Sequence, residues 1–253
     1  MGGWGVGKYE DMCREIHGWG VDVLGVTETK LREHIENENH LYRYVGKGRS
    51  KWTMSGGGIG FLIRKSANID FQELDVNGGK EGEDIMAGFL EYKSGNIMKK
   101  TLIINVYMTT EGSTAMQDNS EKYQIIREII HAYRDISTIL MGDMNAHTGL
   151  LGERVNRNGE LLLQFAEDEE LEILKMTIAG GKVTYSARGQ ESAIDYILVN
   201  SKAREDVNSL WVDEDKNIDI SSDHNILIMT CNREKSRQDE SRESEQIVKW
   251  KIS

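Results

Sequence analysis

Acidic, amide and imidazole side chains stand at the ends of four predicted strands. In chain order they are Glu28 after VDVLGVT, Asp143 and Asn145 after STILMG, Asp195 in SAIDYILVN, and Ser222, Asp223 and His224 before NILIMTC. Strand ends are where a rigid scaffold presents reactive side chains. Carboxylates can bind Mg²⁺ and activate a water, and an imidazole can donate to a charged phosphorane-like transition state. The set therefore predicts a centre that hydrolyses a phosphodiester bond.

Each of these residues also has an ordinary structural explanation. Asp and Asn are favoured in turns and at helix caps, so a single acid after a strand says little about function. His224 could be a hydrogen-bonded histidine at a strand start, and Tyr107, at the end of LIINVY, could be a plain sheet residue. The recurrence at four strand ends favours the functional interpretation, most of all for Glu28 and Asp143.

The elements that would position these residues are visible as hydrophobic patterns. Apolar residues recur with helical spacing over 8–17, around 123–133 and after Asn158, which is predicted to cap the third helix. Short apolar runs between turns rich in Gly and Asn predict strands. They cover residues 21–26, 56–65, 86–93, 100–108, 136–140, 193–199 and 225–231. This mixture predicts an α+β fold.

The charge of the chain restricts how it could bind nucleic acid. Its 253 residues carry a formal net charge of −11, and phosphate binding normally depends on Lys and Arg. Contact with DNA would therefore need a metal ion or a local basic patch. The segment GKGRSKW, with Lys47, Arg49, Lys51 and Trp52, is either a solvated loop or a strand that grips a nucleic-acid backbone and stacks on a base.

The sequence predicts a protein that does not bind a membrane. No run of about 18 apolar residues occurs, and the start MGGWGVGKYEDMCREI lacks the features of a signal peptide. We therefore expect an intracellular protein, nuclear or cytoplasmic, with Cys13 and Cys231 as buried thiols. From Arg233 onward the charges are mixed and without periodicity, which predicts a domain over 1–232 and a charged linker or disordered tail over 233–253.

Four short motifs resemble those of one protein superfamily. VTETKL, GDMNAH, SAIDYILVN and SDH are similar, in order and approximate spacing, to motifs of the exonuclease–endonuclease–phosphatase superfamily. The resemblance covers about residues 8–232 and is closest to endonuclease domains of non-LTR retrotransposons and to craniofacial development protein 2-like proteins. It implies a four-layer sandwich, in which two mixed sheets pack face to face with helices outside.

The resemblance also implies which residues would handle the metal, the water and the phosphate. Glu28 would bind a divalent cation, Mg²⁺ or Mn²⁺, and Asp223 would complete the acidic pocket. Asp143 would orient or deprotonate the attacking water. Asn145 and Tyr107 would contact the phosphate.

A second group of motif residues would support or extend this centre. By the same resemblance, Asp195 would hold the tautomer of His224, which would donate to the phosphoryl oxygen. Thr184, in KVTYS, and Ser222 would lie near the substrate. His147 matches no catalytic position and is interpreted as a turn residue.

Two departures from the superfamily pattern bear on activity. The first strand, which carries an Asn that helps place the metal and phosphate, has no counterpart, because the chain starts at the helix after it. Tyr107 is followed by Met108-Thr109-Thr110 in place of the usual Pro-Asn. Loss of a central strand would leave its neighbours with unpaired backbone groups, so we expect marginal stability and slow catalysis.

Three functions are compatible with these residues. The leading hypothesis is a Mg²⁺-dependent DNA endonuclease of retrotransposon origin that nicks one strand and leaves a 3′-hydroxyl. A phosphoesterase that acts on a smaller substrate is the second, and the acidic charge mildly favours it. The third is a catalytically weak interaction module that retains the fold.

Overall fold

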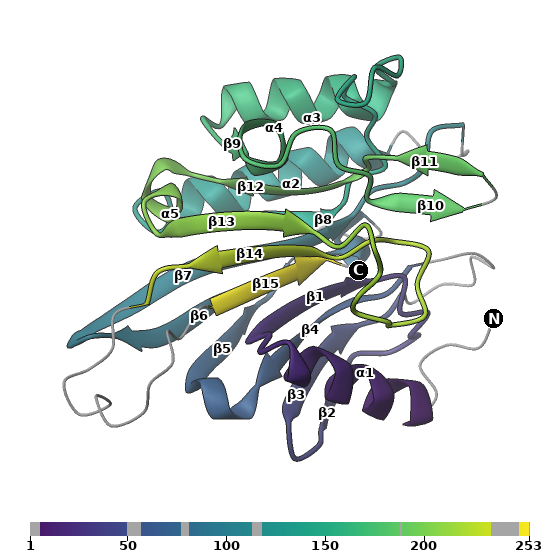
Figure 1. Ribbon diagram of the computed structural model, residues 1–253. Helices are drawn as coiled ribbons and strands as arrows, with labels where there is room; N and C mark the ends of the chain where they lie inside the picture. Colours follow the sequence, from purple (N-terminus) through teal and green to yellow (C-terminus); the bar gives the residue numbers. More distant parts are fainter. Residues whose placement is uncertain are drawn as a thin grey trace.

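Two mixed β-sheets lie at the centre of the fold (Figure 1). The computed structural model describes residues 6–49, 57–76, 81–112, 118–187, 189–233 and 248–252. Within these residues the larger sheet, sheet A, has the strand order β13–β14–β15–β1–β4–β3–β2. Its strands are β1 (Val23–Thr27), β2 (Ile35–Glu38), β3 (Tyr42–Lys47), β4 (Ile59–Arg64), β13 (Val207–Val212), β14 (Leu227–Cys231) and β15 (Val248–Ile252).

The second sheet, sheet B, carries Asp143 and Asp195. Its described strands have the order β5–β6–β7–β8–β12–β9. They are β5 (Ile69–Leu74), β6 (Ile85–Ser94), β7 (Ile97–Tyr107), β8 (Ser137–Asp143), β9 (Glu172–Ile173) and β12 (Asp195–Val199). A separate hairpin consists of β10 (Tyr185–Ala187) and β11 (Gln190–Ser192).

The longer helices cover the outer faces of the two sheets. The longer ones are α1 (Val6–Gly18), α2 (Asp118–Ala132) and α3 (Arg157–Asp168), and the short ones are α4 (Leu174–Thr177) and α5 (Ser201–Arg204). Apolar residues of α1 pack on sheet A, and those of α2 and α3 pack on sheet B. A third apolar cluster, which includes Phe61 from sheet A and Ile103 from sheet B, fills the space between the sheets. The predicted four-layer α+β sandwich is confirmed.

The start of α3 differs from the prediction. Asn156, not Asn158, caps this helix, because its side chain accepts a hydrogen bond from the Gly159 N–H. Asn158 is buried inside the first turn and donates to the backbone oxygens of Thr109 and Asn145. It therefore ties the helix to the loops that follow β7 and β8. The buried thiols expected at Cys13 and Cys231 are confirmed.

The strand β15 overturns part of the prediction for the end of the chain. Residues 248–252 were expected in a tail outside the domain, but they form an interior strand of sheet A. This strand runs parallel to β1, with Val23 opposite Trp250, and antiparallel to β14, with Met229 opposite Trp250. Residues 234–247 lie outside the described residues. Because β1 pairs with β4 on its other side, the expected gap beside β1 is not present.

Candidate active site

Three neighbouring strands of sheet B bring Tyr107, Asp143 and Asp195 side by side. Tyr107 is opposite Asp143 in the parallel pair β7–β8, and Asp143 is opposite Asp195 in the antiparallel pair β8–β12. The Asp143 and Asp195 side chains are almost completely buried. The register of the sheet therefore sets the spacing of two carboxylates and a phenol.

Close strand packing explains the glycine that precedes Asp143. Gly142 has a φ of 149°, and a Cβ atom at this position would lie 1.9 Å from the backbone oxygen of Val106. No side chain fits there unless β7 and β8 separate. Beyond the strand, the Met108 N–H donates to the Asp143 carbonyl oxygen at 2.8 Å, which continues the contact between the two chain segments.

His224 reaches this pair of carboxylates from the segment before β14. Its Nδ1 lies 3.1 and 3.0 Å from the two carboxylate oxygens of Asp195, so the predicted pairing is confirmed. Its Nε2 lies 4.0 Å from Oδ2 of Asp143. The imidazole thus bridges the space between the two acids, with one nitrogen bonded and the other facing Asp143. The ring of Tyr185 packs edge-on against it, with ring centroids 5.0 Å apart.

Thr184 fixes the start of the strand that carries Asp195. Its hydroxyl oxygen accepts hydrogen bonds from the N–H groups of Ile194, at 2.9 Å, and Asp195, at 3.1 Å. Its carbonyl oxygen accepts from the Asn225 N–H at 2.6 Å, which links this strand to the segment of His224. Thr184 is fully buried. Sequence reasoning expected Thr184 near the substrate, whereas these contacts are those of a residue that supports Asp195 and His224.

Glu28 comes from sheet A and meets sheet B through Tyr107. It follows β1 in a left-handed backbone conformation with a φ of 53°. The Tyr107 hydroxyl donates to Oε1 of Glu28 at 2.6 Å. Burial, and then the charge of Glu28, raise the pKa of Tyr107 well above its ordinary value, so the phenol stays protonated and keeps this bond. The Glu28 side chain is otherwise exposed.

Asn145 follows Asp143 with a second left-handed backbone, at a φ of 46°. Its N–H donates to Oδ1 of Asp143 at 2.9 Å, and its side-chain amide donates to the Met108 carbonyl oxygen at 2.8 Å. Non-glycine residues in this conformation cost on the order of 1 kcal/mol and concentrate at functional sites. The strain at Asn145 and Glu28 therefore lies where the reactive groups are.

The charges at the site are strongly coupled. Burial and then the Asp195 carboxylate raise the pKa of Asp143 to about 8, against the opposing effects of His224 and the Asn145 N–H. Burial lowers the pKa of His224, but Asp195, Asp143 and Asp223 together raise it to about 10. Near neutral pH the site therefore favours an imidazolium held between carboxyl groups.

The donor set fits a hard divalent cation. Ligand atoms of Asp143, Asp195 and His224 lie within 4.8 Å of one another. Asp195 already binds Nδ1 of His224 with both carboxylate oxygens, so the exposed carboxylate of Glu28 is the better candidate for a ligand. Crowded carboxylates with a raised pKa are what a nearby cation would stabilise in the charged form. Oxygen ligands of this kind suit Mg²⁺ or Mn²⁺.

The remaining sequence-predicted residues lie around this centre. The Ser222 hydroxyl accepts from the His224 N–H at 3.1 Å, and the exposed Asp223 accepts through its carbonyl oxygen from the Ser186 N–H at 3.0 Å. Lys47 donates to the Gly82 carbonyl oxygen at 2.9 Å. Arg49 stacks over the ring of Tyr107, with its guanidinium carbon 5.6 Å from the ring centroid. Lys51 and Trp52 lie outside the described residues.

A family model matches the part of the chain that carries most of the site. The model, described as endonuclease-reverse transcriptase, matches residues 101–228, just over half of the chain. The chain belongs to this endonuclease-reverse transcriptase family. The matched range contains Tyr107, Asp143, Asp195 and His224, whereas Glu28 lies before it.

Solved structures share the fold of this endonuclease-reverse transcriptase family member. The endonuclease domain of TRAS1, a telomere-specific non-LTR retrotransposon, has a TM-score of 0.64 at 13% identity. The match covers 90% of this chain and 93% of the TRAS1 domain. The Xenopus laevis APE2 catalytic domain has a TM-score of 0.69 at 14% identity, with 91% and 90% covered. An AP endonuclease from Archaeoglobus fulgidus has a TM-score of 0.62 at 14% identity, with 87% and 92% covered. The resemblance to the exonuclease–endonuclease–phosphatase superfamily is confirmed.

No curated protein sequence shows significant similarity to the chain. Among the described residues, no helix has the length and apolar character needed to cross a membrane.

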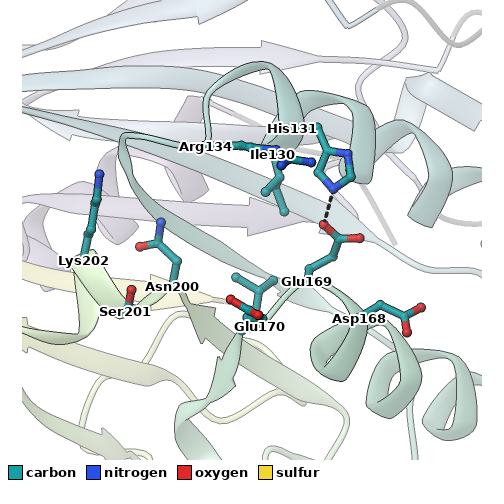
Figure 2. Close-up of a pocket in the computed structure, with 10 residues that line it drawn as sticks. Ile130, His131, Arg134, Asp168, Glu169, Glu170, Asn200, Ser201 and Lys202 are labelled. Atoms are coloured by element: carbon teal, nitrogen blue, oxygen red, sulfur yellow. Dashed lines mark hydrogen bonds and ion pairs between the residues drawn. The ribbon is translucent and has the colours of Figure 1, made fainter.

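A pocket of about 340 Å³ lies at the opposite end of sheet B from this site (Figure 2). It is lined by residues from the end of α2, the end of α3 and the turn after β12, whereas Asp143 ends β8 and Asp195 begins β12. Its clearest polar contact is the bond between Nε2 of His131 and Oε2 of Glu169 at 2.7 Å. The lining also includes Arg134 and Lys202 as cations and Asp168 and Glu170 as carboxylates.

Three buried charged residues were not predicted from the sequence of this endonuclease-reverse transcriptase family member. Lys122 of α2 and Lys175 of α4 are almost fully buried, as is Asp84 at the end of a short 3₁₀ helix, Glu81–Asp84. Lys122 was detectable in principle, because it falls on the apolar face with Asn119, which is also buried. For Asp84 and Lys175 the local sequence holds no comparable signal.

Proposed function

We propose that this chain is a metal-dependent nuclease that hydrolyses a phosphodiester bond in DNA. The observation that carries the proposal is the arrangement of His224, bonded through Nδ1 to Asp195 and facing Asp143 through Nε2 at 4.0 Å. Family membership supports the same class of reaction. The fold match to the TRAS1 endonuclease domain supports a narrower proposal, that the enzyme nicks a target strand as a retrotransposon endonuclease and leaves a 3′-hydroxyl.

Asp143 acts as the base for the attacking water. Its raised pKa of about 8 suits proton acceptance near neutral pH, since a general base works best when its pKa is close to the working pH. The Asn145 N–H on Oδ1 orients the carboxylate, which leaves Oδ2 to receive the proton. The side-chain NH₂ of Asn145 has a second N–H besides the one donated to the Met108 carbonyl oxygen, and this N–H and the Thr110 hydroxyl are the donors available to the phosphate.

His224 donates to the phosphoryl oxygen as negative charge develops. Its raised pKa keeps the imidazole protonated, and Asp195 holds Nδ1, so Nε2 is the nitrogen that donates. Donors already aimed at developing charge stabilise the transition state without reorganisation at the moment of reaction. Asp195 is a positioning residue, and Thr184 and Ser222 hold Asp195 and His224 in turn.

Glu28 would hold Mg²⁺ or Mn²⁺, with Asp223 at the rim of the site. When bound, the cation supplies Lewis-acid stabilisation of the phosphoryl oxygens. Tyr107 fixes the Glu28 carboxylate through the 2.6 Å hydrogen bond. Because the chain carries a net charge of −11, it would bind DNA through a local basic patch. The proposed patch consists of Lys47 and the segment with Lys51 and Trp52.

A supercoiled-plasmid nicking assay tests the proposal. We expect nicking with Mg²⁺, no nicking with EDTA, and a loss of about 10²- to 10⁴-fold in Asp143→Ala. Asp168→Ala is the matched control, because Asp168 is an acid that pairs with Arg127 at the end of α3 and takes no part in the site. A folded protein that hydrolyses only small phosphoesters would be the phosphoesterase alternative. A folded protein with neither activity would be an interaction module.

A further inference from the structure

Tyr107 is held by three charged side chains from separate parts of the chain. Its hydroxyl donates to Glu28, which follows β1. The guanidinium of Arg49, which follows β3, covers its ring at 5.6 Å. The ammonium of Lys122, in α2, donates to its carbonyl oxygen at 2.8 Å. Ring, hydroxyl and backbone of one residue are thus fixed at the same time.

Asp84 joins two of these side chains beneath the site. Its carboxylate accepts from Nε and Nη2 of Arg49 at 2.8 and 2.5 Å, and from Nζ of Lys122 at 3.0 Å. The Asp84 and Lys122 side chains are 5% and 2% exposed, and that of Arg49 is 20% exposed. Two cations therefore share one buried anion, and the set makes a continuous path from Arg49 through Asp84 and Lys122 to Tyr107.

A buried network of this kind is poorly explained by stability alone. Charges removed from water lose solvation, and apolar residues of similar size often stabilise a fold as well or better. The network does provide direction, because the two-pronged Arg49–Asp84 contact and the Lys122 bonds allow little rotation. Its end point is a tyrosine whose hydroxyl contacts an exposed carboxylate on a strained loop. Without that contact, the carboxylate of Glu28 would be free to change rotamer.

We propose that Lys122, Asp84 and Arg49 are positioning residues that set Tyr107, and through it the Glu28 carboxylate, in the geometry that holds a divalent cation. The inference rests on the proposed function, in which Glu28 binds the metal. It also changes the expectation for Arg49, since its guanidinium is directed to Asp84 and the Tyr107 ring, and its task is to position the tyrosine rather than to bind DNA.

Direct binding of Mn²⁺, followed by electron paramagnetic resonance, tests this proposal. Lys122→Met keeps most of the side-chain volume and removes the ammonium. Loss of a residue that orients a metal ligand typically weakens metal binding by about 10- to 100-fold, and we expect a value in this range for Lys122→Met and Tyr107→Phe. In nicking assays, Lys122→Met should need about 10-fold more Mg²⁺ for half-maximal rate and recover most of the maximal rate at saturation.

Lys99→Met is the matched control. Lys99 lies on the same strand as Tyr107, eight residues earlier, and pairs with Asp206 at 2.6 Å. Its loss removes an ion pair of the same type and should leave Mn²⁺ affinity unchanged. If Lys122→Met does not fold, Arg49→Lys decides the question, because it keeps the charge at a less buried position and loses the two-pronged contact.

The outcomes separate this inference from the proposed function. Wild type that neither binds Mn²⁺ nor nicks DNA overturns both. Wild type that does both, with folded Lys122→Met or Arg49→Lys at wild-type Mn²⁺ affinity, overturns the positioning role alone. Weakened Mn²⁺ binding in these variants, with the control unchanged, supports it.

Discussion

Lys175 donates a hydrogen bond from Nζ to the backbone carbonyl oxygen of Asp195 at 3.2 Å, from a side chain with no solvent exposure. Its ammonium also lies 4.6 Å from the ring centroid of Tyr196. Burial lowers the pKa of Lys175 to about 7, although the Asp195 carboxylate opposes this shift. A lysine thus lies directly behind the acid that holds His224, where its charge destabilises the fold.

Lys175→Met should stabilise the protein most at low pH. The folded pKa lies near 7 and the unfolded one near 10.5, so the unfolded chain binds more protons between these values. The contribution of Lys175 to stability is therefore lowest below pH 7 and rises with pH across that window. We expect Lys175→Met to raise the free energy of unfolding at pH 6 by about 1 to 3 kcal/mol.

Urea unfolding of both proteins from pH 6 to pH 9 measures this effect. His224 titrates in the same window with the opposite sign, and its effect cancels in the difference between the two proteins. A variant that is less stable than wild type at pH 6, or a difference that does not shrink as pH rises, would contradict the assignment.

Asp195→Asn should lower the pKa of His224. The carboxylate is the main cause of the raised value of about 10, and burial alone acts in the opposite direction. Because the folded pKa is raised, the pair stabilises the fold fully below about pH 6.5 and loses this effect as pH rises through 10. An NMR titration of the imidazole should give a value at least one unit lower in the variant. An unchanged value would refute the pairing.

Replacements of Thr184 distinguish a supporting residue from one that binds substrate. Thr184→Val removes an oxygen that accepts two backbone N–H groups, and burying them unpaired should cost about 2 to 4 kcal/mol. Thr184→Ser keeps the acceptor and should remain within about 1 kcal/mol of wild type. Thermal unfolding and nicking should fall together in the first variant and stay near wild type in the second. A Val variant with normal stability and reduced substrate affinity would instead support a direct contact.

Deletion of residues 248–253 should destabilise sheet A. The strand β15 pairs with β1 and β14 on its two sides, so its removal opens two rows of backbone groups inside the sheet. We expect the melting temperature to fall by more than about 10 °C, or the chain to fail to fold. Circular dichroism of the deletion beside a control that lacks only Ser253 measures the change. Equal melting temperatures would mean that β15 contributes nothing to the sheet.

An added N-terminal strand should then have little effect on the intact chain. The expectation of marginal stability assumed an open position in the sheet, and β15 closes the position beside β1. The same extension should restore stability to the deletion of 248–253. A large rise in melting temperature for the extended intact chain would show that the two strands do not compete.

The positions of Asp143, Asp195 and His224 were predictable because each depends on a local pattern. An apolar run marks a strand, and the polar residue at its end is then placed at the sheet edge. The contact between Asp195 and His224 needed the resemblance to a known superfamily. Within sheet B, the register of β8 and β12 places Asp143 opposite Asp195.

Other features depended on contacts that no local pattern contains. Residues 248–252 alternate apolar and basic side chains after a charged segment, and their partner β1 is more than 200 residues away. Lys175 looks like a solvent-facing residue, since a lysine is seldom buried without a partner, and the helix pattern that marks Lys122 as buried does not reveal its partner. Their partners, Asp84 and the Asp195 carbonyl oxygen, come from other elements.

The pairing of Val23 with Trp250 also sets the order in which the protein can fold. Strands β1 to β4 pair antiparallel within a short stretch of chain, whereas β15 lies between β1 and β14 and comes from the far end of the sequence. Contacts of such long sequence separation slow folding, because the loop entropy is lost before the contact forms. Until then β1 presents an unpaired edge inside the sheet, and self-association through this edge competes with folding. Refolding yield should therefore fall with protein concentration, and a short peptide of residues 248–252 added in excess should restore it.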